Sequence, residues 1–292
     1  MSDTAGIEPQ PPPLSTPPPP RETWRDWARD LWSFGLKEAW ASLFGGLMLA
    51  AILLSGWLWP SAETTVLGLY RYDWLFVFAV TVQAGMLLSG LEEPREAIVI
   101  AIFHAVATGM EIFKTEMGSW AYPEPALLKF PAGEGNGVPL FAGFMYSAVG
   151  SYIARAWRVM DLRFTGYPPT WQTAVLALAV YVNFFTHHFL YDFRWVLLLA
   201  SFWVFRRCVV WYRPGRRFRR MPQYLANLLV ALFIWFAENA GTFARVWVYP
   251  NQREGWQMVK LDKLVAWYLL MLLSGFLVTL VHKPVEMDAG EA

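Results

Sequence analysis

The chain has 292 residues, of which 56% are hydrophobic and only 16% are charged. Since soluble domains carry about 25% charged residues, this composition predicts a membrane protein. The net charge of +1 excludes a basic nucleic-acid-binding domain, and the single cysteine, Cys208, excludes an intramolecular disulfide and a multi-cysteine metal site.

Residues 1–20, "MSDTAGIEPQPPPLSTPPPP", form a proline-rich polar tail that is predicted to be disordered. Residues 21–40 place tryptophans at helical spacing opposite Arg and Asp residues. This pattern predicts an amphipathic helix lying in the membrane interface.

The remaining chain is predicted to be an all-α transmembrane bundle over residues 41–282, followed by a cytoplasmic tail over 283–292. An apolar stretch must be about 20 residues long to cross a hydrocarbon core of about 30 Å. Eight stretches are long enough: 41–59, 73–91, 97–113, 138–157, 171–189, 194–212, 223–241 and 263–282.

The distribution of Lys and Arg predicts the orientation of this bundle. With both termini in the cytoplasm, the inner segments carry twice as many Lys and Arg residues as the outer segments. The segment "FRRCVVWYRPGRRFRRMP" between the sixth and seventh spans alone holds seven arginines. By the positive-inside rule, we expect a multi-pass membrane protein with both termini cytoplasmic.

Ionisable residues inside the spans are few: His104, Glu111, His187, His188 and Glu238. At about 1.5 Å per residue, Glu111, His187 and Glu238 all lie about 21–24 Å from the inner ends of their spans. This common depth predicts a polar layer near the outer surface, with three further residues just above it: Asp73, Asp192 and Arg194. Such residues usually face inward and mark functional sites, although carboxylates that only fasten neighbouring helices are the alternative.

The stretch "NFFTHHFLYDFRW" contributes the fifth span to this layer. Asn183 and His187 are four residues apart and so share a helix face, which we expect to point inward. His188 lies about 100° further round, so we expect it to bond to Asp192 and support His187.

Two segments of the chain resemble each other. "MEIFKTEMGSWAYPE" and "AENAGTFARVWVYPN" align Glu111 with Glu238, and a W-x-Y-P motif follows each glutamate. The aligned aromatic pairs are Trp120 with Trp247 and Tyr122 with Tyr249, and both pairs have the same sequence offset as the glutamates. Four spans lie between the copies, which predicts two parallel four-helix repeats around an axis along the membrane normal.

The segments "FHAVATGMEIFKTEMGSWAYPE", "GVPLFAGFMYSAVGSYIARAWR", "YVNFFTHHFLYDFRW" and "FIWFAENAGTFARVWVYPNQREGW" resemble domain-of-unknown-function family 817 over roughly residues 35–282. This resemblance implies a polytopic bacterial membrane protein and no established activity. A shorter likeness to carotenoid hydratases and small lycopene cyclases rests on Glu111, Trp120, Tyr122, Gly137, Val138, Pro139 and Glu238. Their acidic P-x-E-E motif is absent from this sequence.

Four functions fit these residues. The first is a membrane enzyme acting on a lipid-soluble, isoprenoid-like substrate without a cofactor. Glu111 or Glu238 would donate a proton, and His187 or His104 would accept one. Six residues would bind the substrate: His104, Trp120, Tyr122, Asn183, Trp247 and Tyr249. Trp120 and Trp247 would stabilise a cationic intermediate.

The other three functions use the same polar layer differently. A proton-coupled carrier would relay protons through it. A metal-dependent enzyme would use the histidines and carboxylates as ligands. A membrane assembly protein would use them only for helix contacts. Membrane lipid is the expected partner in all four cases, and the sequence predicts no oligomeric state.

Overall fold

The computed structural model describes residues 23–133, 136–288 and 290. The predicted tail over 1–20 and the last residues of the 283–292 segment therefore lie outside the described residues. The described chain is mostly helical. Its helices are α1 (Trp24–Ala41), α2 (Leu43–Leu58), α3 (Arg71–Leu88), α4 (Pro94–Glu116), α5 (Ala142–Val159), α6 (Thr170–Thr186), α7 (Arg194–Phe205), α8 (Gln223–Phe243) and α9 (Asp262–Thr279), with a short 3-10 helix η1 (Pro250–Gln252).

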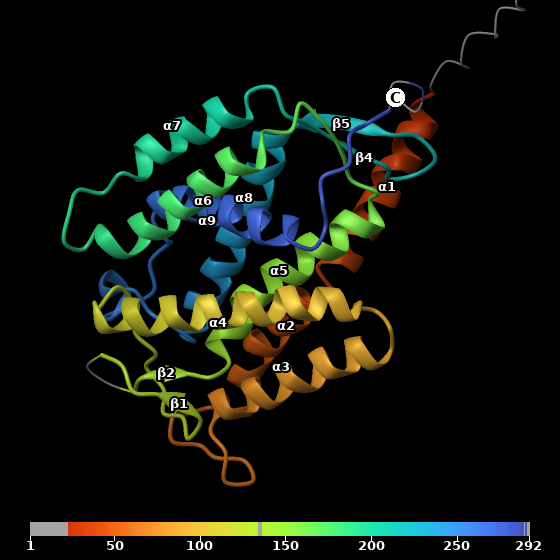
Figure 1. The fold of residues 1–292 in the computed structure, drawn as a ribbon. Helices are drawn as coiled ribbons and strands as arrows, with labels where there is room; N and C mark the ends of the chain where they lie inside the picture. The colour runs from red at the N-terminus through yellow and green to blue at the C-terminus, as the bar shows by residue number, and fades with distance from the viewer. Residues whose placement is uncertain (1–22, 134–135, 289, 291–292) are drawn as a thin grey trace, which may run out of the picture.

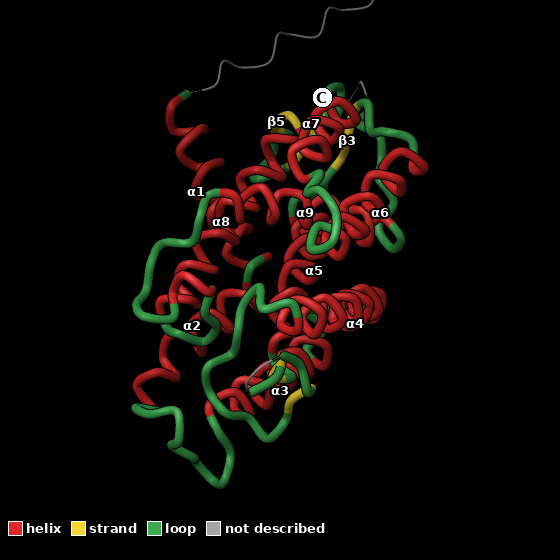
Figure 2. Tube along the Cα trace, turned by 90° about the vertical axis from the view of Figure 1, so that its left-hand side faces the viewer, coloured by secondary structure: helices red, strands yellow, loops and turns green. Residues whose placement is uncertain are grey.

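The helices are arranged around a central pair. In both views, α3 and α4 lie on one side of the molecule and α6 and α7 on the opposite side, with α5 and α9 between them (Figures 1 and 2). Helix α5 packs along α4, and α9 packs along α8 and α6. Helices α5 and α9 also contact each other.

Five short strands lie at the two ends of the bundle. Strands β1 (Lys129–Phe130) and β2 (Val138–Pro139) pair antiparallel in the loop after α4. Strands β3 (Arg163–Thr165), β4 (Val209–Tyr212) and β5 (Arg219–Pro222) form an antiparallel sheet at the other end. Asp30 of α1 binds Arg219 of β5, and Phe164 of β3 pairs with Glu286, so α1 and the C-terminal segment share this end.

The sheet corrects one predicted span. Residues 194–212 do not form one helix, because α7 ends at Phe205 and residues 209–212 form β4. The chain turns at Arg206 and Arg207, two charged residues that a continuing apolar helix would carry into lipid. Val209 and Val210, both β-branched, instead pair with β5.

Three described helices are long and apolar enough to cross a membrane by length and composition: α4, α8 and α9. A fourth span results if α1 and α2 are taken together, although they are bent by 68°. This bend lies at Ser42, next to the predicted boundary between the interfacial helix and the first span. Each of the eight predicted span ranges overlaps a described helix, but α6 and α7 are only 17 and 12 residues long.

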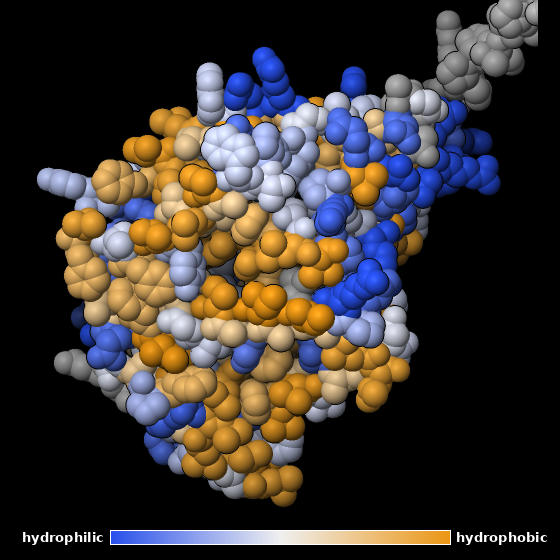
Figure 3. Space-filling model, in the orientation of Figure 1, coloured by the Kyte–Doolittle hydropathy of each residue, from blue (hydrophilic) through white to orange (hydrophobic). Residues whose placement is uncertain are grey.

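The surface agrees with a membrane environment. Hydrophobic residues cover much of the face in Figure 3, whereas hydrophilic residues gather near α1, β4 and β5. Large apolar side chains that would be unfavourable in water are exposed on several helices, including Trp57, Leu88 and Trp203. The molecule is therefore suited to lipid around the helices and to water at the sheet end.

Candidate functional site

The two glutamates singled out by the sequence lie at the end of the bundle opposite the sheet. Glu111 is near the end of α4, and Glu238 is near the end of α8. Both are buried, with 2% of Glu111 and 5% of Glu238 exposed. Buried carboxylates are costly without partners, so their hydrogen bonds define the site.

Aromatic side chains supply these hydrogen bonds. The indole Nε1 of Trp120 and the hydroxyl of Tyr122 each donate to Glu111 Oε2 at 2.8 Å, and Tyr146 of α5 lies beside Glu111. On the other side, the Tyr249 hydroxyl donates to Glu238 Oε1. The indole of Trp267, on α9, donates to Glu238 Oε2.

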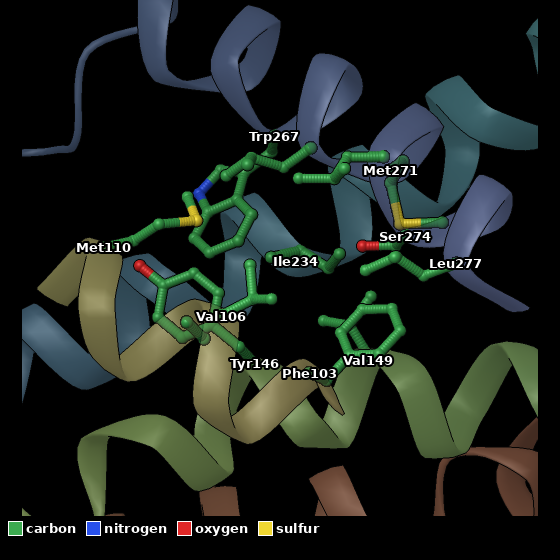
Figure 4. Close-up of a pocket in the computed structure, with 13 residues that line it drawn as sticks. Phe103, Val106, Met110, Tyr146, Val149, Ile234, Trp267, Met271, Ser274 and Leu277 are labelled. Atoms are coloured by element: carbon green, nitrogen blue, oxygen red, sulfur yellow. The ribbon is translucent and has the colours of Figure 1, made fainter. Parts of the chain in front are cut away.

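The two loop tyrosines are therefore equivalent. Tyr122 and Tyr249 each follow their glutamate by 11 residues and bond to it. Burial raises the pKa of both phenols well above the usual value, so both remain neutral donors. Tyr146 and Trp267 also lie next to each other, with ring centroids 5.8 Å apart (Figure 4).

The two W-x-Y-P segments pair directly. The Ala121 amide donates to the Val248 carbonyl at 3.0 Å, and the Val248 amide donates to the Ala121 carbonyl at 2.9 Å. Ala121 and Val248 occupy the same position in the two motifs. The Trp120 ring meets the Tyr249 ring at 6.3 Å across this pair.

The helix ends before these segments also match. The Ser119 amide bonds to the Lys114 carbonyl after α4, and the Val246 amide bonds to the Gly241 carbonyl after α8. Both ends contain one residue with positive φ, Gly118 in the first case and Arg245 in the second. This six-residue closure is a Schellman motif, and it turns each W-x-Y-P segment back over its glutamate.

The copies differ where Gly241 corresponds to Lys114. Without a side chain, Gly241 lets the Trp247 ring pack against the helix, and a Cβ there would overlap that ring. In the first copy the Lys114 side chain occupies this position, and Trp120 turns to Glu111 instead. Trp267 therefore provides the indole for Glu238 that Trp247 does not.

A cavity of about 860 Å³ begins at this layer. Its glutamate end is lined by Glu111, Glu238, Trp120, Trp247 and Lys263, and its walls are mostly apolar residues of α2, α5, α8 and α9. It extends to Glu38 of α1 and Gln223 of α8 near the sheet. The lining is that of a site for an elongated and mostly apolar molecule.

A much smaller apolar cavity, about 30 Å³, lies between α4, α5, α8 and α9. Figure 4 shows it bounded by Phe103, Ile234 and Met271, with Tyr146 and Trp267 at one side. Its size suits no more than a water molecule or a shift of neighbouring side chains.

The histidines of the "NFFTHHFLYDFRW" stretch meet a lysine. Lys114 Nζ lies 3.0 Å from His187 Nε2 and 2.8 Å from His188 Nε2. His187 Nδ1 is 2.9 Å from the Asn183 carbonyl oxygen. His188 also lies 3.5 Å from Ser119 Oγ.

His188 and Asp192 were predicted to bond to each other and so support His187, but the structure gives each of them other partners. Instead of bonding to His188, Asp192 accepts from the Asn183 amide at 3.2 Å and from the Arg194 backbone amide at 3.0 Å. Asn183 also accepts from the Phe193 amide, so it stabilises the α6–α7 loop rather than facing the glutamates. This correction has a simple cause: α6 ends at Thr186, and the helical angle assumed for His188 does not apply beyond it.

The remaining predicted residues hold elements in place. His104 packs against α5, where its ring lies 4.6 Å from the Phe144 ring and a Cβ at Gly143 would come within 2.7 Å of it. Asp73 accepts from the backbone amides of Leu127 and Leu128 at 2.8–3.1 Å and so holds the loop before β1. Arg194 joins Asp192 to Asp262 of α9.

A second buried polar cluster lies at the sheet end, and sequence reasoning missed it. Arg155 of α5 pairs with Glu92 at 3.1 Å, and both side chains are 1% exposed. Ser151 and Gln83 also donate to Glu92. Beside it, Glu96 pairs with Arg158 at 3.3 Å. The "LEEPRE" segment looks like an ordinary charged loop, so its burial could not be predicted.

Sequence reasoning also missed Lys114, Tyr146, Lys263 and Trp267. Lys114 follows Glu111 by three residues within an apolar helix, and that spacing is the one signal that pointed to it. The other three come from α5 and the start of α9 and reach the site only through tertiary packing. Within the described part of the chain, no group of three His, Cys, Asp or Glu residues could hold a metal ion.

Comparisons with known proteins place these residues in a family. The family model "Protein of unknown function (DUF817)" matches residues 30–275. The "Uncharacterized protein YoaT" of Bacillus subtilis (strain 168) is 38% identical over 262 residues, which cover 89% of this chain and 94% of that protein. No solved structure matches. The matched region includes both glutamates, both W-x-Y-P segments and the histidine pair.

Proposed function

The chain belongs to the DUF817 family of proteins of unknown function, and we propose that it is a membrane protein that performs acid/base chemistry on an elongated lipid-soluble molecule. One observation carries this proposal. The cavity of about 860 Å³ has mostly apolar walls, and Glu111 and Glu238 line one end of it. Its volume lies in the range of about 300–1,000 Å³ typical of small-molecule sites.

The hydrogen bonds give the two glutamates similar surroundings. Glu111 accepts from Trp120 and Tyr122, and Glu238 accepts from Trp267 and Tyr249. Each carboxyl group therefore has one indole and one phenol partner, and a phenol can accept as well as donate. We assign proton exchange with the ligand to this pair of glutamates.

The indole rings fit the same chemistry. Trp120 and Trp247 both line the glutamate end of the cavity. Their ring faces attract a cation, so they would stabilise positive charge that develops on a protonated double bond. An isoprenoid-like hydrocarbon is the substrate class that this arrangement suits best.

We propose that the bundle consists of two repeats, α2–α5 and α6–α9, which together make eight membrane spans. Within each half, the first helix packs against the second and the fourth, and the third packs against the fourth. Between the halves, α2 contacts α8 and α6 contacts α4. The matched helix ends and the pairing of Ala121 with Val248 add to this support.

The proposed orientation places the sheet end in the cytoplasm and the glutamate layer near the outer face of a bacterial cell membrane. The arginines of β4, β5 and their connection lie at the sheet end, as the positive-inside rule requires. In this orientation α1 lies in the inner interface, at an angle to α2.

A proton-coupled carrier is a second candidate, and one observation favours it. Buried Glu92 and Glu96 at the sheet end supply ionisable groups on the cytoplasmic side of the outer layer. A carrier must exchange protons with both sides of the membrane. Both glutamates are already held in ion pairs, Glu92 with Arg155 and Glu96 with Arg158.

Occupation of the cavity tests the proposal. Gly275 lines the cavity and has open space beside it, so Gly275→Leu should fill part of that space. Gly109 also has open space but does not line the cavity, which makes Gly109→Leu the matched control. Each protein is purified in detergent, extracted with organic solvent and analysed by mass spectrometry for bound apolar molecules.

We expect the wild type and Gly109→Leu to retain an apolar molecule and Gly275→Leu to retain at least about tenfold less. If the wild type, Gly109→Leu and Gly275→Leu retained equal amounts of the apolar molecule, the cavity would not be its binding site. For the chemistry, Glu238→Gln should accumulate the unconverted molecule. Turnover that survives in both Glu238→Gln and Glu111→Gln would exclude acid/base catalysis by this pair.

A further inference from the structure

The large cavity has a second polar end, near the three-stranded sheet. Four polar side chains line it there: Glu38 of α1, Tyr152 of α5, and Gln223 and Asn227 of α8. Between this sheet end and the glutamate end, the lining is mostly apolar. A molecule that fills the whole cavity would therefore place one end against each polar group of residues.

The side-chain amide of Gln223 is only partly bonded. Its Nε2 donates to Asn227 Oδ1 at 2.9 Å. Its Oε1 is buried and has no hydrogen-bond partner among the residues that the structure describes. An amide oxygen accepts up to two hydrogen bonds, and a buried one without a donor is unfavourable. A donor on a cavity ligand would bond to this oxygen.

Glu38 adds to the acceptor character of this end. The Tyr152 hydroxyl donates to Glu38 Oε2 at 2.9 Å, so this donor is already used. The carboxylate offers its other oxygen only as an acceptor when it is ionised. The sheet end therefore suits a ligand group that donates a hydrogen bond.

Helix α1 forms a wall of the cavity at this end. It lies beside β4 and β5 (Figure 1), where Asp30 binds Arg219 at 2.6 Å. The Phe34 ring of α1 meets the Tyr212 ring of β4 at 5.5 Å, and both rings line the cavity. These contacts hold Glu38 in the lining.

The length of α8 between the two polar ends indicates the length of the ligand. Gln223 and Glu238 are 15 residues apart on this helix, which corresponds to about 22 Å. An extended chain of four isoprene units with a terminal oxygen spans about 19 Å at about 1.2 Å per bond. The difference is about one hydrogen-bond length.

We propose that the sheet end of the cavity binds the hydroxyl group of a long-chain isoprenoid alcohol, which donates its hydrogen bond to Gln223 Oε1. This inference rests on the proposed function and names its substrate class. The alcohol would lie along α8, with its hydroxyl group at the sheet end and its last double bond at Glu111 and Glu238.

The repeat makes this a single site per chain. Glu96 precedes Glu111 by the same number of residues as Gln223 precedes Glu238, so Glu96 is the counterpart of Gln223. Glu96 is paired with Arg158 at 3.3 Å and does not line the cavity. The ligand would therefore bind in one orientation only.

Geranylgeraniol and its methyl ether provide a test, because they share the chain and the oxygen but the ether has no donor. Binding of each is measured in detergent with the wild type, Gln223→Met and Gln223→Glu, which keeps an acceptor oxygen. Gln172→Met is the matched control, because Gln172 is in the first turn of α6 and does not line the cavity.

We expect the wild type and Gln172→Met to bind the alcohol at least about tenfold more tightly than the ether. Gln223→Met should bind both alike, whereas Gln223→Glu should keep the preference. Gly275→Leu should weaken both probes equally, because it fills space along the chain and leaves the polar end unchanged. Each preference is a ratio within one protein sample, so a partial loss of folded protein does not change it.

Equal binding of the two probes to the wild type, or tighter binding of the ether, would overturn the hydroxyl site and leave the cavity proposal intact. An unchanged preference in Gln223→Met would exclude Gln223 as the acceptor. Loss of the preference in Gln223→Glu as well would show that packing, and not the acceptor oxygen, decides it. If the wild type bound neither probe, the cavity proposal itself would fail.

Discussion

Ala121 and Val248 exchange two backbone hydrogen bonds, of 3.0 and 2.9 Å, and they are separated in the sequence by the same interval as Glu111 and Glu238. An antiparallel pair is related by a local two-fold axis between its two residues. Because equivalent residues of the two segments meet, each W-x-Y-P segment supports the other, and each returns a tyrosine to its own glutamate.

This relationship predicts equal effects of the two tyrosines on stability. Tyr122→Phe and Tyr249→Phe each remove one donor from a buried carboxylate, and each should lower the free energy of unfolding by about 1–2 kcal/mol. Unfolding in detergent, followed by circular dichroism, measures the change. Tyr191→Phe is the control, because Tyr191 is 86% exposed. A large loss for one tyrosine and none for the other would contradict the equivalence.

The packing of Trp247 predicts that Gly241 cannot carry a side chain. Gly241→Ala places a methyl group in the Trp247 ring, so the protein should lose about 1–3 kcal/mol of stability. Gly109→Ala, at a helix position with open space, should instead gain about 0.5–1 kcal/mol. The midpoints of thermal unfolding of the two variants should therefore move in opposite directions. A shift of both in the same direction would show that helix propensity, and not the ring, decides the effect.

The buried pair at the sheet end should be essential for folding. Arg155→Met leaves Glu92 buried without its cation and should cost about 3–5 kcal/mol. Adding Glu92→Gln removes the uncompensated charge, so the double variant should be more stable than Arg155→Met. The control is Arg95→Met, since Arg95 is exposed in the same segment. A double variant no more stable than Arg155→Met would show that packing of Arg155 matters more than its charge.

The proposed topology predicts where reporters will lie. Alkaline phosphatase fused after Gly137 or after Gln252 should be active, because both positions lie at the glutamate end. A fusion after Arg217, in the segment between β4 and β5, should be inactive. Green fluorescent protein at the same three positions provides the complementary readout. Phosphatase activity after Arg217 would reverse the orientation and place the glutamates near the cytoplasm.

The sequence by itself determined the features that depend on short-range patterns. Hydrophobic runs predicted a helix in each of eight ranges, and the constant offset between the two motifs made Tyr122 and Tyr249 equivalent partners of Glu111 and Glu238. Each tyrosine is only 11 residues from its glutamate, and a helix end followed by a tight turn brings it back. Local geometry is sufficient for such contacts.

Only the tertiary structure decided the contacts between distant helices. Lys114 meets His187 across 73 residues, and Tyr146 and Trp267 reach the glutamates from α5 and α9. No periodicity encodes which face of one helix meets another, so His188 was wrongly paired with Asp192. The length of α7 was also decided by pairing, because Val209–Tyr212 is apolar enough for a helix but gains its hydrogen bonds from β5. Apolar pattern determines which segments avoid water, whereas side-chain packing determines which polar groups meet.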